Sequence, residues 1–310
     1  MFRAALLYLS EQKQINTFVR RNALARRGAS RFVAGETIDE AAAAVRALNA
    51  KRISASLDLL GESVTNADEA RVAASAIVGI FDRIAADKLD CNVSVKLTQL
   101  GFDLGEDLVR ENVRRILDRA KQLGIFLRVD MEGSAHTQRT LDLFERELFP
   151  AYGRDIVGIV VQSYLYRTRE DVARLIGMGV RVRLCKGAYR EPPSVAFPAK
   201  ADVDRSFGEL MEQLIECGPY PGIATHDEAL IARAKRFVQA KGVPRDRFEF
   251  QMLNGVRRDL QDRLVEEGYR LRVYVPYGTQ WYPYFMRRLA ERPANIAFIV
   301  GNVLREGVRR

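Results

Sequence analysis

Polar and charged side chains alternate with apolar ones in several short segments of this chain. Lys96 ends the segment NVSVK, Asp130 lies in RVDME, and Arg183 lies in VRVRL. Because successive side chains of a β-strand point to opposite faces, each segment places its polar residues on one face. Ionised groups on a buried face need a partner of opposite charge or a ligand. The pattern therefore favours a ligand-lined interior over a purely structural network of charges.

A second group of candidate residues lies in YGTQWYPYFMRRLAERPAN, residues 277–295. Tyr284, Arg287 and Arg288 lie three or four residues apart or adjacent, so they converge on one face of a helix. Two neighbouring guanidinium groups can clamp a carboxylate in a plane. Taken alone, the segment is more typical of a solvated helix face. It indicates a binding site only when it is read together with the polar residues of the preceding strands.

These residues belong to a regular alternation of strands and helices. Strands are predicted at residues 53–57, 92–97, 126–132, 157–162, 180–186, 222–226, 248–253 and 271–276. Helices are predicted at residues 68–86, 106–122, 137–148, 169–178, 206–216, 228–240, 257–267 and 282–291. Strand and helix alternating eight times is the pattern of an α/β fold of the (β/α)8 TIM-like type, which we expect here in a distorted form.

The chain divides into two predicted parts. Residues 1–50 are expected to form an N-terminal helical segment, in which Thr37 caps the second helix. Residues 51–310 are expected to form the catalytic barrel. In barrel enzymes the chemistry lies at the C-terminal ends of the strands, where Lys96, Asp130 and Arg183 are found.

Composition narrows the class of protein. A chain of 310 residues that is 47% hydrophobic can bury a large core, and none of its apolar stretches approaches the roughly 20 residues of a membrane span. The net charge of +9 comes from dispersed arginines without a nucleic-acid motif, so we expect no nucleic-acid partner. Two histidines and three scattered cysteines predict no metal site and fit a cytoplasmic protein with reduced thiols.

Seven ordered motifs together resemble the proline dehydrogenase family, both its free-standing enzymes and the matching domain of bifunctional proline utilisation proteins. The motifs are SLDLLGE (56–62), VSVKLT (93–98), RVDMEG (128–133), RLCKGAYRE (183–191), ATHDE (224–228), FQMLNG (250–255) and YFMRRLAERPAN (284–295). The resemblance implies oxidation of L-proline to 1-pyrroline-5-carboxylate, the first step of proline catabolism to glutamate. It also implies noncovalent FAD as hydride acceptor and a membrane quinone, ubiquinone or menaquinone, as the final electron acceptor.

The resemblance also assigns roles to individual residues. Lys96, Asp130 and Arg183 would be catalytic, with Asp130 steering Lys96 or Arg183 by charge pairing. The substrate pocket would consist of Lys96, Leu253, Tyr274, Tyr284, Arg287 and Arg288. The flavin contacts would be Asp130, Gln162, Arg183, Lys186, Gly187, Ala188, His226 and Glu291. Glu62 would pair with Arg287 as a gate over bound substrate.

One departure from the bifunctional pattern concerns partners. Arg190 follows the GAY triplet where bifunctional relatives usually carry tryptophan, which is more similar to the free-standing branch. We therefore expect a separate pyrroline-5-carboxylate dehydrogenase to perform the next step. Delivery of electrons to a quinone implies peripheral contact with the inner face of the cell membrane.

Three other functions remain compatible with parts of the pattern. A Schiff-base aldolase would use Lys96 or Lys186, but would leave the paired arginines unexplained. A folate-linked flavin reductase would also be yellow, but would consume a nicotinamide cofactor. A basic module for RNA or lipid would bind no chromophore and would depend strongly on salt. The protonation state of Lys96, which separates a fixed cation from an imine-forming amine, is left open by the sequence.

Overall fold

The computed structural model describes residues 29–291, with side chains up to residue 288, and contains a closed barrel of eight parallel strands. The strands are β1 (Ser54–Leu59), β2 (Cys91–Val95), β3 (Leu127–Val129), β4 (Val157–Gln162), β5 (Val182–Cys185), β6 (Gly222–Ala224), β7 (Glu249–Leu253) and β8 (Leu271–Tyr277). Each strand pairs with the next, and β8 closes the barrel against β1. The predicted (β/α)8 fold is confirmed.

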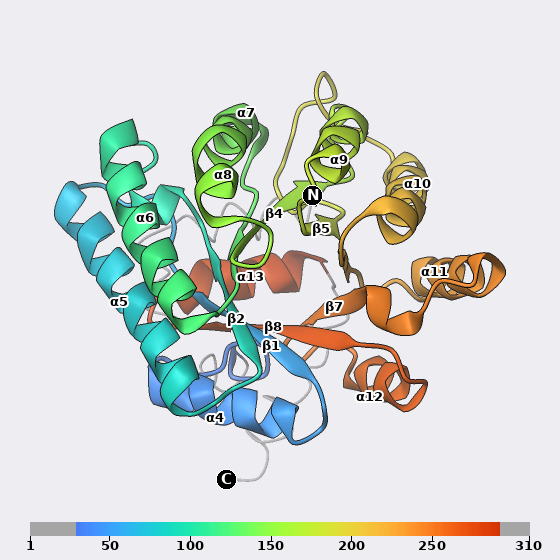
Figure 1. The fold of residues 1–310 in the computed structure, drawn as a ribbon, viewed down its shortest axis with the longest axis horizontal. Helices are drawn as coiled ribbons and strands as arrows, with labels where there is room; N and C mark the ends of the chain where they lie inside the picture. Colours follow the sequence, from blue (N-terminus) through green and yellow to red (C-terminus); the bar gives the residue numbers. More distant parts are fainter. Residues whose placement is uncertain (1–28, 292–310) are drawn as a thin grey trace, which may run out of the picture.

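Helices surround the barrel as an outer ring (Figure 1). They are α5 (Ala67–Ala86), α6 (Glu106–Leu123), α7 (Ser134–Leu143), α8 (Phe149–Tyr152), α9 (Thr168–Gly177), α10 (Lys200–Cys217), α11 (Glu228–Lys241) and α12 (Arg258–Glu266). Short 3-10 turns lie at Thr98–Leu100 and Arg245–Arg247, and a π-helical turn at Phe144–Leu148 joins α7 to α8. This π turn divides the helix that was predicted as continuous over residues 137–148.

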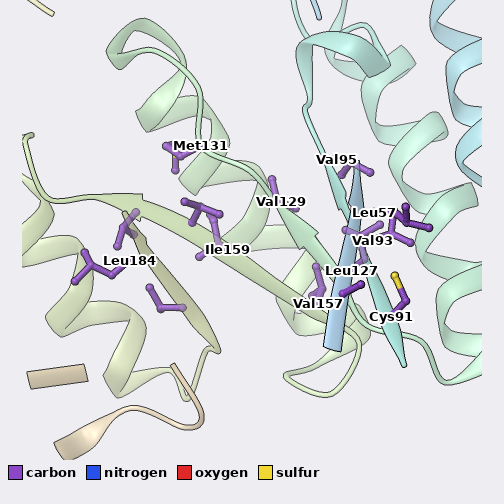
Figure 2. Packing of buried hydrophobic residues seen from close by; sticks show 14 of the residues in the cluster. Leu57, Cys91, Val93, Val95, Leu127, Val129, Met131, Val157, Ile159 and Leu184 are labelled. Atoms are coloured by element: carbon purple, nitrogen blue, oxygen red, sulfur yellow. The ribbon is translucent and has the colours of Figure 1, made fainter. Parts of the chain in front are cut away.

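The main core lies between the strands and the helices, as Figure 2 shows for Leu57, Val93, Val129, Ile159 and Leu184. All five side chains are fully buried. They occupy the apolar face of each strand, so the alternation in the sequence places them outward against the helices. Burying each such side chain stabilises the fold by about 1.5 to 3 kcal/mol. The polar face of each strand is thereby turned into the lumen.

The helix α4 (Ile38–Asn49) precedes the barrel and packs on it through Ala41 and Val45, which belong to the same core. Thr37 caps this helix as predicted: its hydroxyl accepts from the backbone N–H of Glu40, and the Glu40 carboxylate accepts from the backbone N–H of Thr37. This reciprocal capping box satisfies two N–H groups that the helix itself leaves unpaired. Residues 1–28 of the predicted N-terminal helical segment lie outside the described residues.

The last described helix, α13 (Trp281–Glu291), lies inside the ring of helices in Figure 1. It forms a second apolar cluster with Phe32, with Leu60 after β1 and with Val256 after β7. Because these strand ends are C-terminal ends, α13 is held at the end of the barrel where TIM-type enzymes carry their chemistry. Across residues 29–291, no helix combines the length and apolarity that crossing a bilayer requires.

Candidate functional site

Arg183 is the central cation of the lumen, and its side chain is almost fully buried. Its Nη1 donates to Asp130 Oδ1 at 2.8 Å, and its Nε donates to Gln251 Oε1 at 2.5 Å. The Tyr274 hydroxyl donates to the other oxygen of Asp130 at 2.8 Å, and its ring centroid lies 5.3 Å from Arg183 Cζ. Burial and the charges of Asp130 and Asp58 raise the pKa of Tyr274 well above its usual value, so Tyr274 acts as a neutral donor.

Lys96 forms a separate buried ion pair with Asp58, and its Nζ lies 3.1 Å from both carboxylate oxygens. Burial opposes the charge on Lys96, but attraction to Asp58 and Asp130 outweighs it and raises the lysine pKa. Lys96 is therefore an ammonium group at neutral pH. A protonated amine cannot attack a carbonyl, which argues against Lys96 as the lysine of a Schiff-base aldolase.

Asp130 was expected to steer either Lys96 or Arg183. Its direct ion pair is with Arg183, whereas Asp58 pairs with Lys96. Asp58 is thus a functional candidate that the sequence analysis missed, although it lies in the motif SLDLLGE. The signal was available, because Ser54, Ser56 and Asp58 alternate with apolar residues just as the polar residues around Lys96 do.

On α13, the two adjacent arginines have different neighbours. Arg287 Nη1 donates to Glu62 Oε1 at 2.5 Å, joining the helix to the segment after β1. Burial alone would raise the pKa of Glu62, but attraction to Arg287 and Lys96 lowers it below its ordinary value. Arg288 Cζ lies 5.1 Å from the ring centroid of Tyr284 on the same helix. Arg287 therefore connects α13 to the segment after β1, whereas Arg288 and Tyr284 contact each other on the helix.

The loop after β5 carries Lys186, Gly187 and Ala188. Lys186 Nζ lies 2.5 Å from Asp204 on α10 and 2.9 Å from Asp227 after β6. Gly187 has a φ of +118°, and a Cβ added there would approach the Tyr164 ring to 2.5 Å. Only glycine combines this backbone angle with that contact, so the loop has a fixed path over the strand ends.

Two further predicted contacts are tied to neighbouring backbone. Gln162 at the end of β4 donates through Nε2 to the carbonyl of Glu132 at 2.9 Å. His226 Nε2 accepts from the backbone N–H of Leu253 at 2.9 Å. An accepting Nε2 means that the ring proton of neutral His226 lies on Nδ1. The side chain of Glu291 lies outside the described residues.

Tyr189 is the other residue that the sequence analysis missed. Burial and the charge of Glu62 raise the pKa of its hydroxyl, and Lys96, Glu132 and Arg287 also act on it. Tyr189 therefore lies among the charged groups that connect β1, β2 and α13. The only sequence signal was its place in the motif RLCKGAYRE, between residues that were singled out.

The arrangement brings fixed positive charges from β2, β5, the loop after β5 and α13 to the C-terminal end of one barrel. Each of Lys96, Arg183, Lys186 and Arg287 has a carboxylate partner. Such a site can bind a carboxylate, and it can stabilise negative charge that develops on a planar ligand. The sequence alone had placed Lys96, Arg183 and Lys186 toward the ends of strands and Arg287 on the last helix, and of their carboxylate partners the resemblance had named only Asp130 and Glu62.

Comparison with known proteins gives a consistent result. The family model described as proline dehydrogenase matches residues 41–300. "Proline dehydrogenase" of Deinococcus radiodurans is 44% identical over 308 residues, covering 98% of this chain and 98% of that protein. "Proline dehydrogenase 1" of Bacillus subtilis is 41% identical over 306 residues, covering 99% of this chain and 100% of that protein.

Among solved structures, proline utilization A from Bdellovibrio bacteriovorus, inactivated by N-propargylglycine, superposes with a TM-score of 0.82 at 23% identity. The match covers 96% of this chain and 39% of that longer protein. At this identity the likeness concerns the fold, and it agrees with the closed (β/α)8 barrel described above.

Proposed function

This chain belongs to the proline dehydrogenase family, and we propose that it oxidises L-proline to 1-pyrroline-5-carboxylate with FAD as first electron acceptor and a membrane quinone as second. The observation that carries the proposal is the convergence of Lys96, Arg183 and Arg287 at one end of the lumen, each with a carboxylate partner. A lumen lined by apolar side chains, or by cations without carboxylate partners, would not support this assignment.

The substrate site is proposed to lie between α13 and the ends of β2, β7 and β8. Arg287 and Arg288 would bind the proline carboxylate, because a guanidinium fork matches both carboxylate oxygens. Tyr274 and Tyr284 would offer broad, rigid surfaces to the saturated ring. Leu253, which packs against the α13 cluster, and Lys96 would complete the site.

The residues at the strand ends fit a noncovalent flavin dinucleotide. A buried arginine, Arg183, and the polar end of β4 provide donors deep in the lumen, and Lys186 and the fixed loop at Gly187 lie beyond them. We propose that the flavin is held by Asp130, Gln162, Arg183, Lys186, Gly187, Ala188, His226 and Glu291. When bound, FAD would supply the acceptor for the two electrons and the hydrogen that leave proline.

Three roles follow for the chain's own groups. Lys96, protonated and fixed by Asp58, would hold a positive charge beside the reacting ring. Arg183, fixed by Asp130 and Gln251, would stabilise negative charge that develops on the flavin during the reaction. Both carboxylate oxygens of Asp130 accept hydrogen bonds, one from Arg183 and the other from the Tyr274 hydroxyl. These contacts hold the cations in place before substrate arrives.

Glu62 is proposed as a gate. Its ion pair with Arg287 spans from the segment after β1 to α13 and would cover bound substrate. We further propose that quinone reduction requires peripheral contact with the inner face of the cell membrane, and that a separate pyrroline-5-carboxylate dehydrogenase consumes the product. A relative in Klebsiella aerogenes is named "Bifunctional protein PutA", and a name that gives one chain two functions supports a link between proline oxidation and the step that follows it.

An anaerobic absorbance titration tests the proposal. Purified protein supplied with FAD should be yellow and should lose its flavin absorbance when L-proline is added without any nicotinamide cofactor. Addition of a quinone with phospholipid vesicles should restore the absorbance. Protein that takes up no flavin, or that is bleached only by a reduced nicotinamide, would show that the proposal is wrong and would favour one of the other functions.

The carboxylate clamp is tested by Arg288→Lys, with Arg263→Lys on α12 as a control at a half-exposed arginine. A lysine cannot reproduce a fork bonded to both oxygens, and losing one such charged hydrogen bond costs about 1.5 to 3 kcal/mol. The proline concentration for half-maximal bleaching should therefore rise by roughly 10- to 150-fold in Arg288→Lys and stay constant in Arg263→Lys. An unchanged value in Arg288→Lys would contradict its role.

A further inference from the structure

A pocket of about 260 Å³ lies at the opposite, N-terminal end of the barrel, among the starts of β2, β3, β5, β6, β7 and β8. Three arginines line it: Arg128 and Arg272 from within β3 and β8, and Arg181 from just before β5. The ring of Tyr220 lies 5.7 Å from Arg181 Cζ. In barrel enzymes this end contributes to stability rather than to the reaction, so the pocket is separate from the proposed proline site.

The two carboxylates that line the pocket are already engaged by neighbours. Glu249 accepts from Arg272 Nε at 2.7 Å, from Gln251 Nε2 at 2.5 Å and from the Tyr220 hydroxyl at 3.1 Å. Asp90 accepts from the hydroxyl of Ser54 at 2.6 Å. Arg272 is thus paired with Glu249, while Arg181 is paired with the exposed Asp155 outside the pocket, at 3.1 Å. Solvent screens that exposed pair.

Arg128 has no carboxylate partner among the described residues, although its side chain is only 2% exposed. Its Nη1 donates to two neutral acceptors, the carbonyls of Ile159 at 3.3 Å and Arg181 at 3.0 Å. No described residue accepts a hydrogen bond from its Nε. Burial, with repulsion from Arg183 and Arg272, lowers the pKa of Arg128 well below its usual value, although attraction to Glu249 and Asp130 opposes this shift. A buried guanidinium in this condition is costly unless an anion joins it.

We propose that this pocket binds a small oxyanion, such as inorganic phosphate, sulfate or a short carboxylate, which neutralises Arg128 and stabilises the folded barrel. Guanidinium groups are suited to this chemistry because their planar N–H forks match the oxygens of such anions. The volume is several times the roughly 30 Å³ of a water molecule, so an anion of four or five heavy atoms fits. The occupant has no part in proline oxidation.

Thermal unfolding of the FAD-saturated protein tests the proposal. Inorganic phosphate is titrated at constant ionic strength, with sodium chloride replacing it, and sulfate and acetate are run in parallel. A ligand that binds only the folded state raises the midpoint in proportion to the logarithm of its concentration. We expect a rise of roughly 2 to 5 °C at a hundred-fold excess over the dissociation constant. The oxyanion that acts at the lowest concentration identifies the class of occupant.

Two matched variants locate the effect. Arg181→Gln removes a cation from the pocket wall, and its side chain is 32% exposed, so the substitution leaves the core intact. Arg169→Gln removes an exposed cation on α9 that pairs with Glu209 and is remote from the pocket residues. The oxyanion response should weaken at least several-fold in Arg181→Gln and persist in Arg169→Gln.

Arg128→Met is the sharper variant, since it should abolish the response, but it also removes a side chain that bridges two strands. If it does not fold, Arg181→Gln decides the matter. The proposal is overturned if chloride reproduces the rise at equal ionic strength, if the midpoint of the unmodified protein does not rise with the logarithm of the oxyanion concentration, or if Arg181→Gln responds like the unmodified protein.

Discussion

The buried pair of Lys96 and Asp58 allows a quantitative prediction for Asp58→Asn. The Nζ of Lys96 lies 3.1 Å from each Asp58 oxygen, and both side chains are nearly excluded from solvent. At this distance and an effective dielectric constant of about 20, the attraction is about 5 kcal/mol. Asparagine retains one accepting oxygen, and Asp130 and Glu62 still attract the lysine. We therefore expect a net loss of about 3 kcal/mol, which lowers the pKa of Lys96 by about 2 units.

The sign of the pH effect follows from the raised pKa of Lys96. The stability that the charged lysine contributes is complete below its unfolded pKa of about 10.4 and is lost as the pH rises through the higher folded value. In Asp58→Asn this loss should be smaller and should end at a lower pH, because the folded pKa falls while the unfolded pKa stays the same. If the ammonium group supports proline oxidation, the rate of flavin reduction by proline should also fall at a lower pH in the variant.

Stopped-flow reduction between pH 6 and 11 measures the rate, and ¹³C NMR of lysine labelled at Cε measures the titration directly. Asp262→Asn is the matched control, because Asp262 pairs with Lys51 at 3.0 Å while both side chains are about half exposed. An exposed pair of this kind contributes about 0 to 1 kcal/mol, so the control should behave like the unmodified protein. The reasoning would be refuted if the rate in Asp58→Asn fell toward pH 11 no more than in the unmodified protein, or if Asp262→Asn showed the same fall as Asp58→Asn.

Three further predictions concern the gate and the loop after β5. Glu62→Gln should change the KM for proline by at least about threefold at pH 6 to 8. In this range the lowered pKa of Glu62 keeps its pair with Arg287 charged. Identical KM and kcat values in the variant and the unmodified protein would exclude a gate. Gly187→Ala should lower the free energy of unfolding in urea by about 2 to 4 kcal/mol, against about 1 kcal/mol for Gly179→Ala, which has a positive φ but open space around it. Lys186→Gln should flatten the fall in stability below about pH 4. Burial raises the pKa values of Asp204 and Asp227, but hydrogen bonds from Lys186 outweigh it and lower them, so the stability that these carboxylates contribute is present above their unfolded pKa and is lost as the pH falls through their folded pKa. An unchanged loss of stability at acid pH in the variant would contradict this.

The barrel could be predicted because its strands have two chemically different faces. Val93 and Val95 face the helices while Ser94 faces Arg183, whose Nη1 lies 3.2 Å from the Ser94 hydroxyl. This period of two is a local property, so the sequence displays it directly. Thr37 at the start of α4 is local in the same sense, because a capping box involves residues only three positions apart.

Partner choice inside the lumen could not be predicted in this way. Asp130 could have paired with either Lys96 or Arg183, and the decision depends on the stagger of strands around the closed barrel. The start of α10 was also placed too late, at residue 206 instead of Lys200, because residues 200–205 lack apolar periodicity. Their charged side chains make other contacts, since Asp204 in this part of α10 pairs with Lys186.

The ion pair between Glu62 and Arg287 constrains how the proposed substrate site can work. A substrate carboxylate bound to Arg287 would lie beside the Glu62 carboxylate, and two negative charges about 5 Å apart repel by about 3 kcal/mol at an effective dielectric constant of about 20. The lowered pKa of Glu62 prevents relief by protonation at neutral pH. Glu62 must therefore adjust within the gate when the carboxylate binds, so that Arg287 lies between the two carboxylates and the pair still covers the substrate. Glu62 can do so without breaking the barrel, because it lies in residues 60–64, after β1 and outside any strand pairing.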